Sequence, residues 1–208
     1  MILSNTFEVY GRPVSQHLGL VRGNVVRSRF IGRVFQDPML GTIGDMMVEE
    51  NMFLANHRGK NTGLAWGLKK KQREAFQNML EPLGLGLETR LGERMKNLSG
   101  GQRQSITLTM ATMNSPRLLL LDEHTAALDP ETAKIVMQIT DDIVKKAHLT
   151  TIMVTHNMRD AIRYGNRLIM MADGKIIFDA RDEEKAQLTV EELIKKFSEK
   201  TGDVLPDT

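Results

Sequence analysis

Two short stretches of the sequence carry residue types that suit chemistry on a phosphate group. In the first, NLSGGQRQ at residues 97–104, Ser99, Gly100 and Gly101 stand directly before an expected helix. Glycine lets backbone N–H groups approach a ligand, and the first turn of a helix favours a bound anion. Core packing offers no evident reason for these residue types, and an anion cradle is one interpretation that the residues allow. The alternative is a flexible helix entrance, which such a stretch alone more often forms.

The second stretch, LLLLDE at residues 118–123, ends a run of leucines with two carboxylates. The leucines predict a buried strand, and the carboxyl end of such a strand is where open α/β sheets bind ligands. Because adjacent strand residues point to opposite faces, we expect Asp122 and Glu123 to have different tasks. One could hold a hydrated Mg²⁺, while the other could face a water for in-line attack on a phosphate. A strand end with two solvated acids is the alternative interpretation.

Helices and strands must alternate around these stretches to position them. Helical patterns cover residues 102–114 and 130–147, and apolar or β-branched runs at residues 117–121 and 150–155 predict strands. This alternation is typical of a parallel sheet covered by helices.

Two further patterns flank this region. Upstream, the sequence turns helical from about residue 48 to residue 83, with apolar residues that could share one face: Trp66, Leu68, Phe76, Met79 and Leu80. Downstream, a hairpin is expected to turn at Asp173 and Gly174. A last helix follows, capped by Thr189 with Glu192 three residues on.

Composition argues against several classes of function. The 208 residues hold 28 Lys and Arg against 26 Asp and Glu, a balance that does not suggest nucleic acid as the main partner. The lack of cysteine excludes disulfides, thiolate metal sites and a cysteine nucleophile. No stretch approaches the ~18 apolar residues that a membrane-spanning helix needs, so we expect any work at a membrane to be done from its side.

Five motifs in series resemble those of ABC ATPases. VFQDP at 34–38 resembles the Q-loop, LSGGQRQ at 98–104 the signature, LLLLDE at 118–123 the Walker B motif, ALD at 127–129 the D-loop and THN at 155–157 the H-loop. They stand in the family's order and are together highly specific. The resemblance covers about residues 30–197, is strongest to the ATP-binding subunits of bacterial importers, and implies ATP and Mg²⁺ as cofactors.

The resemblance also implies roles for single residues. In ABC dimers the signature of one subunit faces ATP bound to the other, so Ser99 would donate its hydroxyl to the γ-phosphate. Glu123 would act as general base or water positioner, and His156 would contact the γ-phosphate. Gln36 would touch Mg²⁺ and the attacking water, and Asp129 would lie at the dimer interface. The implied cofactor-binding residues are Ser99, Gly100, Gly101, Gln102, Asp122 and Asp129, with Gln36 and Asp122 at the metal.

Several features depart from the family pattern. His124 replaces the usual proline and Ala126 the usual D-loop serine. More seriously, no Gly-x-x-x-x-Gly-Lys-Ser/Thr occurs in the sequence, and without that phosphate loop the triphosphate loses its main cradle. We therefore expect this chain by itself to bind ATP poorly. The other histidines have no comparable context and are expected at the surface: His17, His57, His124 and His148.

Three explanations compete for the missing loop. The favoured one is a cassette that lost its front through truncation or a change of reading frame. The second is a catalytically silent, regulatory partner whose Ser99 completes the ATP site of another subunit. The third, an ABC ATPase outside transport, would need a long coiled coil between Gln36 and Ser99, zinc cysteines or two cassettes, and none is present.

The expected fold is therefore α/β, an incomplete P-loop NTPase of the ABC ATPase type with a parallel sheet flanked by helices and a helical subdomain. Residues 1–28 resemble the family poorly, residues 29–199 form a partial ABC ATPase domain with its helical subdomain at about 45–100, and residues 200–208 are a tail. The implied function is ATP hydrolysis in a cassette dimer that drives import of a small solute. The implied partners are a second ABC subunit, membrane-embedded permease subunits and a substrate-binding protein, at the cytoplasmic face of the membrane.

Overall fold

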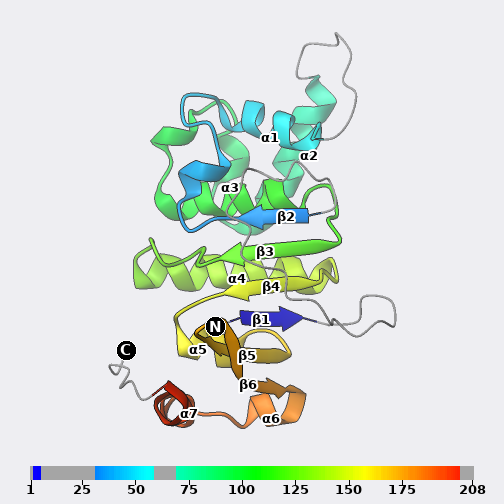
Figure 1. The fold of residues 1–208 in the computed structure, drawn as a ribbon. Helices are drawn as coiled ribbons and strands as arrows, with labels where there is room; N and C mark the ends of the chain where they lie inside the picture. The colour runs from blue at the N-terminus through cyan, green and yellow to red at the C-terminus, as the bar shows by residue number, and fades with distance from the viewer. Residues whose placement is uncertain (1, 6–30, 59–68, 202–208) are drawn as a thin grey trace. The chain divides into compact units, whose positions relative to one another are not determined.

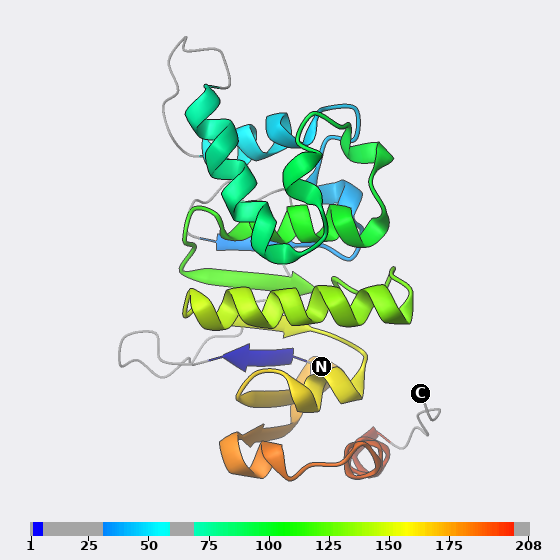
Figure 2. The ribbon, with the colours of Figure 1, turned by 180° about the vertical axis from the view of Figure 1, so that it is seen from behind.

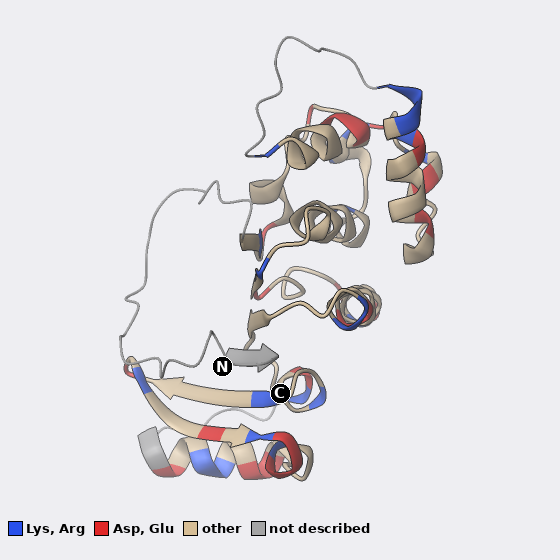
Figure 3. Ribbon diagram, turned by 90° about the vertical axis from the view of Figure 1, so that its right-hand side faces the viewer, with Lys and Arg blue, Asp and Glu red and all other residues tan. Residues whose placement is uncertain are grey.

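The computed structural model describes residues 2–5, 31–58 and 69–201. The chain divides into two compact units, one formed by Ser28–Leu149 and the other by Met1–Arg27 with Thr150–Thr208 (Figure 1). Basic and acidic residues are interspersed in both (Figure 3), in keeping with the formal net charge of +2.

The Ser28–Leu149 unit is built on two parallel strands, β2 (Ile31–Val34) and β3 (Leu118–Asp122), paired so that Val34 lies opposite Leu121. Helix α3 (Gly100–Thr112) packs against β2 and against α4 (Pro130–Lys146), which runs along the same side of the strand pair (Figure 2). Because β2 and β3 run in the same direction, the residues that follow them emerge at one edge. That edge positions the candidate site.

The helical part of this unit surrounds an apolar core. Its described residues form α1 (Val48–Asn56), α2 (Lys70–Leu80) and the short 3₁₀ helices η1 (Pro38–Gly41), η2 (Glu81–Leu83), η3 (Leu87–Thr89) and η4 (Met95–Asn97). The core residues come from α1, α2, α3 and the segments between them: Val48, Met52, Phe76, Leu80, Leu87, Leu91, Met95 and Ile106.

The expected apolar face of residues 48–83 is only partly correct. Phe76 and Leu80 are buried, but Met79 is 39% exposed. Trp66 and Leu68 lie outside the described residues. The error arises because residues three apart on a helix share a face only approximately, so the edge of an apolar stripe is not defined by spacing alone.

The other unit is an antiparallel arrangement of short strands. β1 (Ile2–Asn5) pairs antiparallel with both β4 (Thr151–Val154) and β5 (Arg167–Ala172), and β5 pairs antiparallel with β6 (Lys175–Arg181). The remaining elements are α5 (Met158–Arg163), α6 (Asp182–Ala186) and α7 (Val190–Thr201). The strands expected at residues 117–121 and 150–155 are present as β3 and β4, and the parallel pairing expected of the sheet is seen between β3 and β2. Neither β2 nor β1 was anticipated, because four residues are too few to show a period.

Local signals in this unit are confirmed. The β5–β6 hairpin turns at Asp173 and Gly174, whose φ angles of 48° and 74° suit a tight hairpin turn. At the start of α7 the Glu192 N–H donates to Thr189 Oγ1 at 3.2 Å, and the Thr189 N–H donates to Glu192 Oε2 at 2.9 Å. None of the helices in the described ranges has the length and apolar character needed to cross a bilayer.

Candidate functional site

The carboxyl edge of β2 and β3 brings three of the expected site residues into one neighbourhood. Gln36 follows β2 and is exposed, Asp122 is the last residue of β3, and Glu123 follows it. An unexpected cation joins them, since Arg33 Nη2 lies 3.2 Å from Asp122 Oδ2 with the two side chains 44% and 47% exposed. The Arg33 guanidinium also lies over the Phe35 ring, 4.5 Å from its centroid. The carboxylate expected at the metal is therefore paired with an arginine that the motif comparison did not single out.

Glu123 does not continue the strand, which corrects the expectation that Asp122 and Glu123 alternate across it. Its φ of 44° places it in the left-handed region, where few residues other than glycine are found. Its carbonyl accepts a hydrogen bond from the Ala126 N–H at 2.9 Å, which closes a turn. The two carboxylates are thus separated by a change of backbone direction rather than by the strand pleat.

His124 is buried, so the expectation that it lies at the surface is wrong. It is 2% exposed, and its Nε2 lies 3.1 Å from Thr140 Oγ1 on α4. Burial lowers the pKa of His124 to about 4, so the ring is neutral at pH 7. Of the other histidines, His148 is exposed, His57 is half-buried with its ring centroid 4.1 Å from that of Phe53, and His17 lies outside the described residues. Sequence position alone carried no signal for the burial of His124.

The serine of the signature stretch is a helix cap. The Gln102 N–H donates to Ser99 Oγ at 3.2 Å, and the Ser99 N–H donates to Gln102 Oε1 at 3.2 Å, which forms a capping box at the start of α3. Gln102 Oε1 also accepts from Arg90 Nη1 at 2.8 Å. The structure thus gives Ser99 and Gln102 a structural role that is independent of any ligand.

The two glycines of the stretch differ, and packing does explain one of them. Gly101 is buried, and a Cβ there would lie 2.2 Å from Thr132 Cγ2 on α4, far inside contact distance. Gly100 is exposed, and a Cβ there would lie 3.1 Å from Leu128 Cδ2. The expectation that packing does not require glycine is therefore wrong for Gly101. The exposed part of the corner is Ser99 and Gly100, beside the segment that carries Asp129.

Asp129 likewise caps a helix. Its Oδ1 accepts from the Thr132 N–H at 3.0 Å at the start of α4. Hydrogen bonds from the side chain and the backbone of Thr132 hold the pKa of Asp129 below its usual value, and the carboxylate is fully exposed. Because Asp129 and the Ser99–Gly100 corner are both exposed, both segments are accessible to a second protein.

His156 belongs to the other unit, so its meeting with the edge residues stays a prediction. It is exposed and follows β4, and local hydrogen bonds join the residues on either side of it. The Asn157 N–H donates to Thr155 Oγ1 at 3.0 Å, and Asn157 Oδ1 accepts from the Arg159 N–H at 3.0 Å to cap α5. These bonds define the backbone on both sides of His156.

The donor set at the β2–β3 edge suits a Mg²⁺ that keeps most of its water. Within residues 2–5, 31–58 and 69–201, no three or more His, Asp or Glu side chains are arranged to hold a metal ion. Mg²⁺ needs only one or two protein carboxylates together with phosphates and waters, and Asp122 could supply one. Arg33 would have to leave Asp122 Oδ2 for that oxygen to bind a cation.

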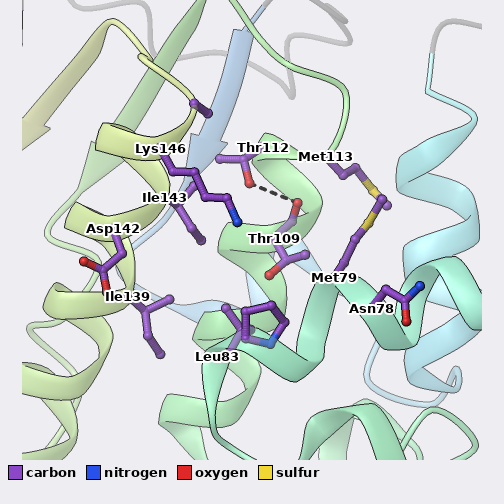
Figure 4. A pocket seen from close by; sticks show the side chains of 12 residues that line it. Asn78, Met79, Leu83, Thr109, Thr112, Met113, Ile139, Asp142, Ile143 and Lys146 are labelled. Carbon is purple, nitrogen blue, oxygen red and sulfur yellow. Dashed lines mark hydrogen bonds between the residues drawn. The ribbon is translucent and has the colours of Figure 1, made fainter.

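A separate pocket lies among α2, α3 and α4 (Figure 4). Its volume is about 360 Å³, and its wall is mainly apolar, with Met79, Leu83, Met113 and Ile143 among the lining residues. None of the sequence-predicted site residues lines it. The pocket therefore offers no support for the phosphate chemistry of the edge.

Comparison with known proteins gives consistent matches. A family model described as "ABC transporter" matches residues 6–126, which begins upstream of the region where the motif resemblance was recognised. The tyrosine transport ATP-binding protein of Clostridioides difficile is 48% identical over 171 residues, covering 82% of this chain and 68% of that protein. A methionine import ATP-binding protein of Oenococcus oeni is 32% identical, covering 76% of this chain and 42% of its own length. The chain thus spans between about two fifths and two thirds of these relatives.

Solved structures show the same fold. The ADP conformation of MJ1267, an ATP-binding cassette of an ABC transporter, matches 81% of this chain and 68% of its own with a TM-score of 0.63 at 24% identity. MJ0796, described as a bacterial ABC transporter cassette in a dimeric structure, matches 73% of this chain and 62% of its own with a TM-score of 0.58 at 28% identity. The expected α/β fold of ABC ATPase type is thereby confirmed.

Proposed function

Because the chain belongs to the ABC transporter family, we propose that it is an ATP-hydrolysing subunit that works in a cassette dimer and drives import of a small solute. The observation that carries the proposal is the shared edge of β2 and β3, where Gln36, Asp122 and Glu123 come together. The exposed Ser99–Gly100 corner also supports the proposal, because the start of α3 is accessible to a partner there. ATP and Mg²⁺ are the cofactors that this arrangement would serve.

Each edge residue has a task that its position allows. Glu123, turned out of the strand by its left-handed backbone, would accept a proton from the attacking water or orient it. Asp122 would hold Mg²⁺ once Arg33 leaves its Oδ2, and exposed Gln36 would contact the metal and the water. His156 would stabilise the charge that develops on the transferred phosphate. A bound Mg²⁺ would neutralise phosphate charge during the transfer.

Because the sequence has no phosphate loop, we propose that a second protein helps to hold the nucleotide. No Gly-x-x-x-x-Gly-Lys-Ser/Thr is present, so the chain alone should hold a triphosphate weakly. Ser99 and Gly100 would face a nucleotide held by a second cassette. The Ser99 hydroxyl can serve there while its oxygen still accepts from Gln102, because a hydroxyl both donates and accepts.

Apolar residues after the Gln36 segment support a permease partner. Five large side chains on or near η1 and α1 are each at least 40% exposed: Met39, Leu40, Ile43, Met47 and Leu54. Large apolar side chains that stay exposed in this number suit a contact with another protein. We propose that the protein works at the cytoplasmic face of the membrane, with a substrate-binding protein in the same system. The relatives named for tyrosine and methionine favour an amino acid as the solute.

The test is a hybrid chain in which a strand and helix carrying a Gly-x-x-x-x-Gly-Lys-Ser/Thr loop, taken from an intact cassette, precede Phe30 of this chain. The hybrid is expected to hydrolyse ATP, and Glu123→Gln should lower kcat by about 100-fold or more, as loss of a general base does. Glu74→Gln is the matched control, because Glu74 is an exposed carboxylate on α2 in the helical part of the unit. Equal turnover in the Glu123→Gln hybrid and its parent would refute the catalytic assignment.

A silent partner is the second candidate, favoured by the combination of an exposed signature corner and no phosphate loop. In this case the unmodified chain would stimulate the ATPase of an intact cassette without hydrolysing ATP itself. Ser99→Ala should abolish the stimulation. Stimulation that survives Ser99→Ala, or none with any intact cassette tried, would count against this candidate.

A further inference from the structure

Gln104 is a buried amide that joins three elements of the Ser28–Leu149 unit. Its side chain has no exposed surface. Its Nε2 donates to the Phe35 carbonyl at 2.9 Å and to the His124 carbonyl at 2.6 Å. Because both neighbours of Nε2 are acceptors, the orientation of the amide is determined, and both of its N–H groups are used.

The two acceptor carbonyls stand next to the residues expected to do the chemistry. Phe35 precedes Gln36 after β2, and His124 follows Glu123 after β3. Gln104 itself lies in α3, one turn and a half beyond Ser99, so a single side chain connects the helix of the signature corner to both edge segments. The ends of these strands are also linked by the parallel pairing at Val34 and Leu121 and by the exposed Arg33–Asp122 ion pair, and neither of these links includes Phe35 or His124.

The amide oxygen of Gln104 is further evidence that its two donated hydrogen bonds are the reason for a glutamine at this position. Gln104 Oε1 is buried and has no hydrogen-bond donor among the described residues. A buried acceptor without a partner is unfavourable, and an apolar side chain of the same length would avoid that penalty. The glutamine is thus better explained by its two N–H donors than by filling space.

We infer that Gln104 is a positioning residue, which holds the segments of Gln36 and Glu123 at a fixed separation and makes both follow any movement of α3. The inference deepens the proposed function, because it assumes that these two residues act together on one phosphate. Its geometric part does not depend on ATP hydrolysis, so it can be tested without an active enzyme.

The first test measures hydrogen exchange of the full chain without nucleotide. Gln104→Met removes both donors at similar length, and Gln104→Glu replaces them with an acceptor that faces two carbonyls. In both variants the Ala126 N–H, which closes the turn at Glu123, and the Leu40 N–H, which bonds to the Asp37 carbonyl, should exchange about tenfold faster. The β5–β6 hairpin should be unaffected. Unchanged exchange at both amides would overturn the inference.

A matched control separates positioning from general loss of stability. Thr109→Val, also buried in α3, removes a hydrogen bond that stays within the helix, from Thr109 Oγ1 to the Ser105 carbonyl at 2.9 Å. It should leave exchange at Ala126 and Leu40 within about twofold of wild type. If it accelerates both amides as much as Gln104→Met does, Gln104 is only a packing residue.

A measurement on the unmodified chain covers the case in which the variants do not fold. Both side-chain N–H protons of Gln104 should be protected from solvent exchange in its NMR spectrum, since each is donated inside the protein. Rapid exchange of either proton would overturn the inference.

The last test uses the hybrid chain described above. Gln104→Met should lower kcat for ATP by about tenfold or more while KM changes less than about threefold, because alignment rather than nucleotide binding is lost. A rise in KM at constant kcat would contradict positioning. If the parent hybrid has no ATPase activity, the proposed function fails, whereas the exchange measurements still decide the role of Gln104.

Discussion

Replacing Gly101 with alanine should destabilise the protein through contact between α3 and α4. The added Cβ would lie 2.2 Å from Thr132 Cγ2, more than an ångström inside ordinary contact, and the Gly101 backbone belongs to a packed helix that cannot easily move away. Overpacking of this kind costs about 1–3 kcal/mol, offset by the roughly 0.5–1 kcal/mol that alanine gains over glycine in a helix. We expect a net loss of about 1–2 kcal/mol, or a fall in Tm of about 4 °C.

Thermal and urea unfolding of four chains would measure this loss: wild type, Gly101→Ala, Thr132→Ser and the double variant. Thr132→Ser removes the Cγ2 methyl, so the same alanine should become nearly neutral in that background. Gly100→Ala is the control, because its Cβ meets only the end of the flexible Leu128 side chain. Equal stability of Gly100→Ala and Gly101→Ala, or no recovery with Thr132→Ser, would refute the packing explanation.

Three further predictions concern other parts of the molecule. Ser99→Ala should lower the free energy of unfolding by about 1 kcal/mol through loss of the helix cap. Ser99→Asp should keep the cap and the stability, but it should place a carboxylate against the nucleotide and abolish ATPase activity or the stimulation of a partner cassette. Burial lowers the pKa of His124 to about 4, so as the pH drops from 6.5 toward 4 the unfolded chain binds the proton before the folded chain does. The free energy of unfolding, measured with urea at several pH values, should therefore be highest above pH 6.5 and fall by up to about 3 kcal/mol toward pH 4. A pH profile identical to that of His124→Gln would contradict this. Leu40→Asp, at a side chain that is 65% exposed, should leave unfolding unchanged but reduce co-purification with permease subunits, and undiminished recovery would exclude this surface from the contact.

The candidate site shows which sequence signals were reliable. The leucine run predicted β3 and its acidic end, and the serine and glycine stretch correctly marked the beginning of α3. The roles inside that stretch were less predictable, because Ser99 satisfies the helix start and Gly101 makes room for Thr132. A motif identifies positions that cannot change freely, but not whether a ligand or a neighbouring helix imposes the restriction.

The burial of His124 is a second feature that the sequence pattern did not show. One histidine after two acids gives no periodic signal, and its environment comes from Thr140, which lies sixteen residues further along the chain on α4. The left-handed backbone of Glu123 was equally hidden, since sequence patterns describe regular strands better than the residue that ends one.

The sequence by itself determined the features that depend on near neighbours: the alternating helices and strands, the turn at Asp173 and Gly174, and the cap at Thr189. It also contained the order of the five motifs, which was enough to identify the family. Only the tertiary structure decided that Arg33 pairs with Asp122, 89 residues away, and that Gln104 joins Phe35, 69 residues away, to the turn after Glu123. The physical reason is that periodicity and capping act within a few residues, whereas these contacts exist only after β2, β3 and α3 have packed together.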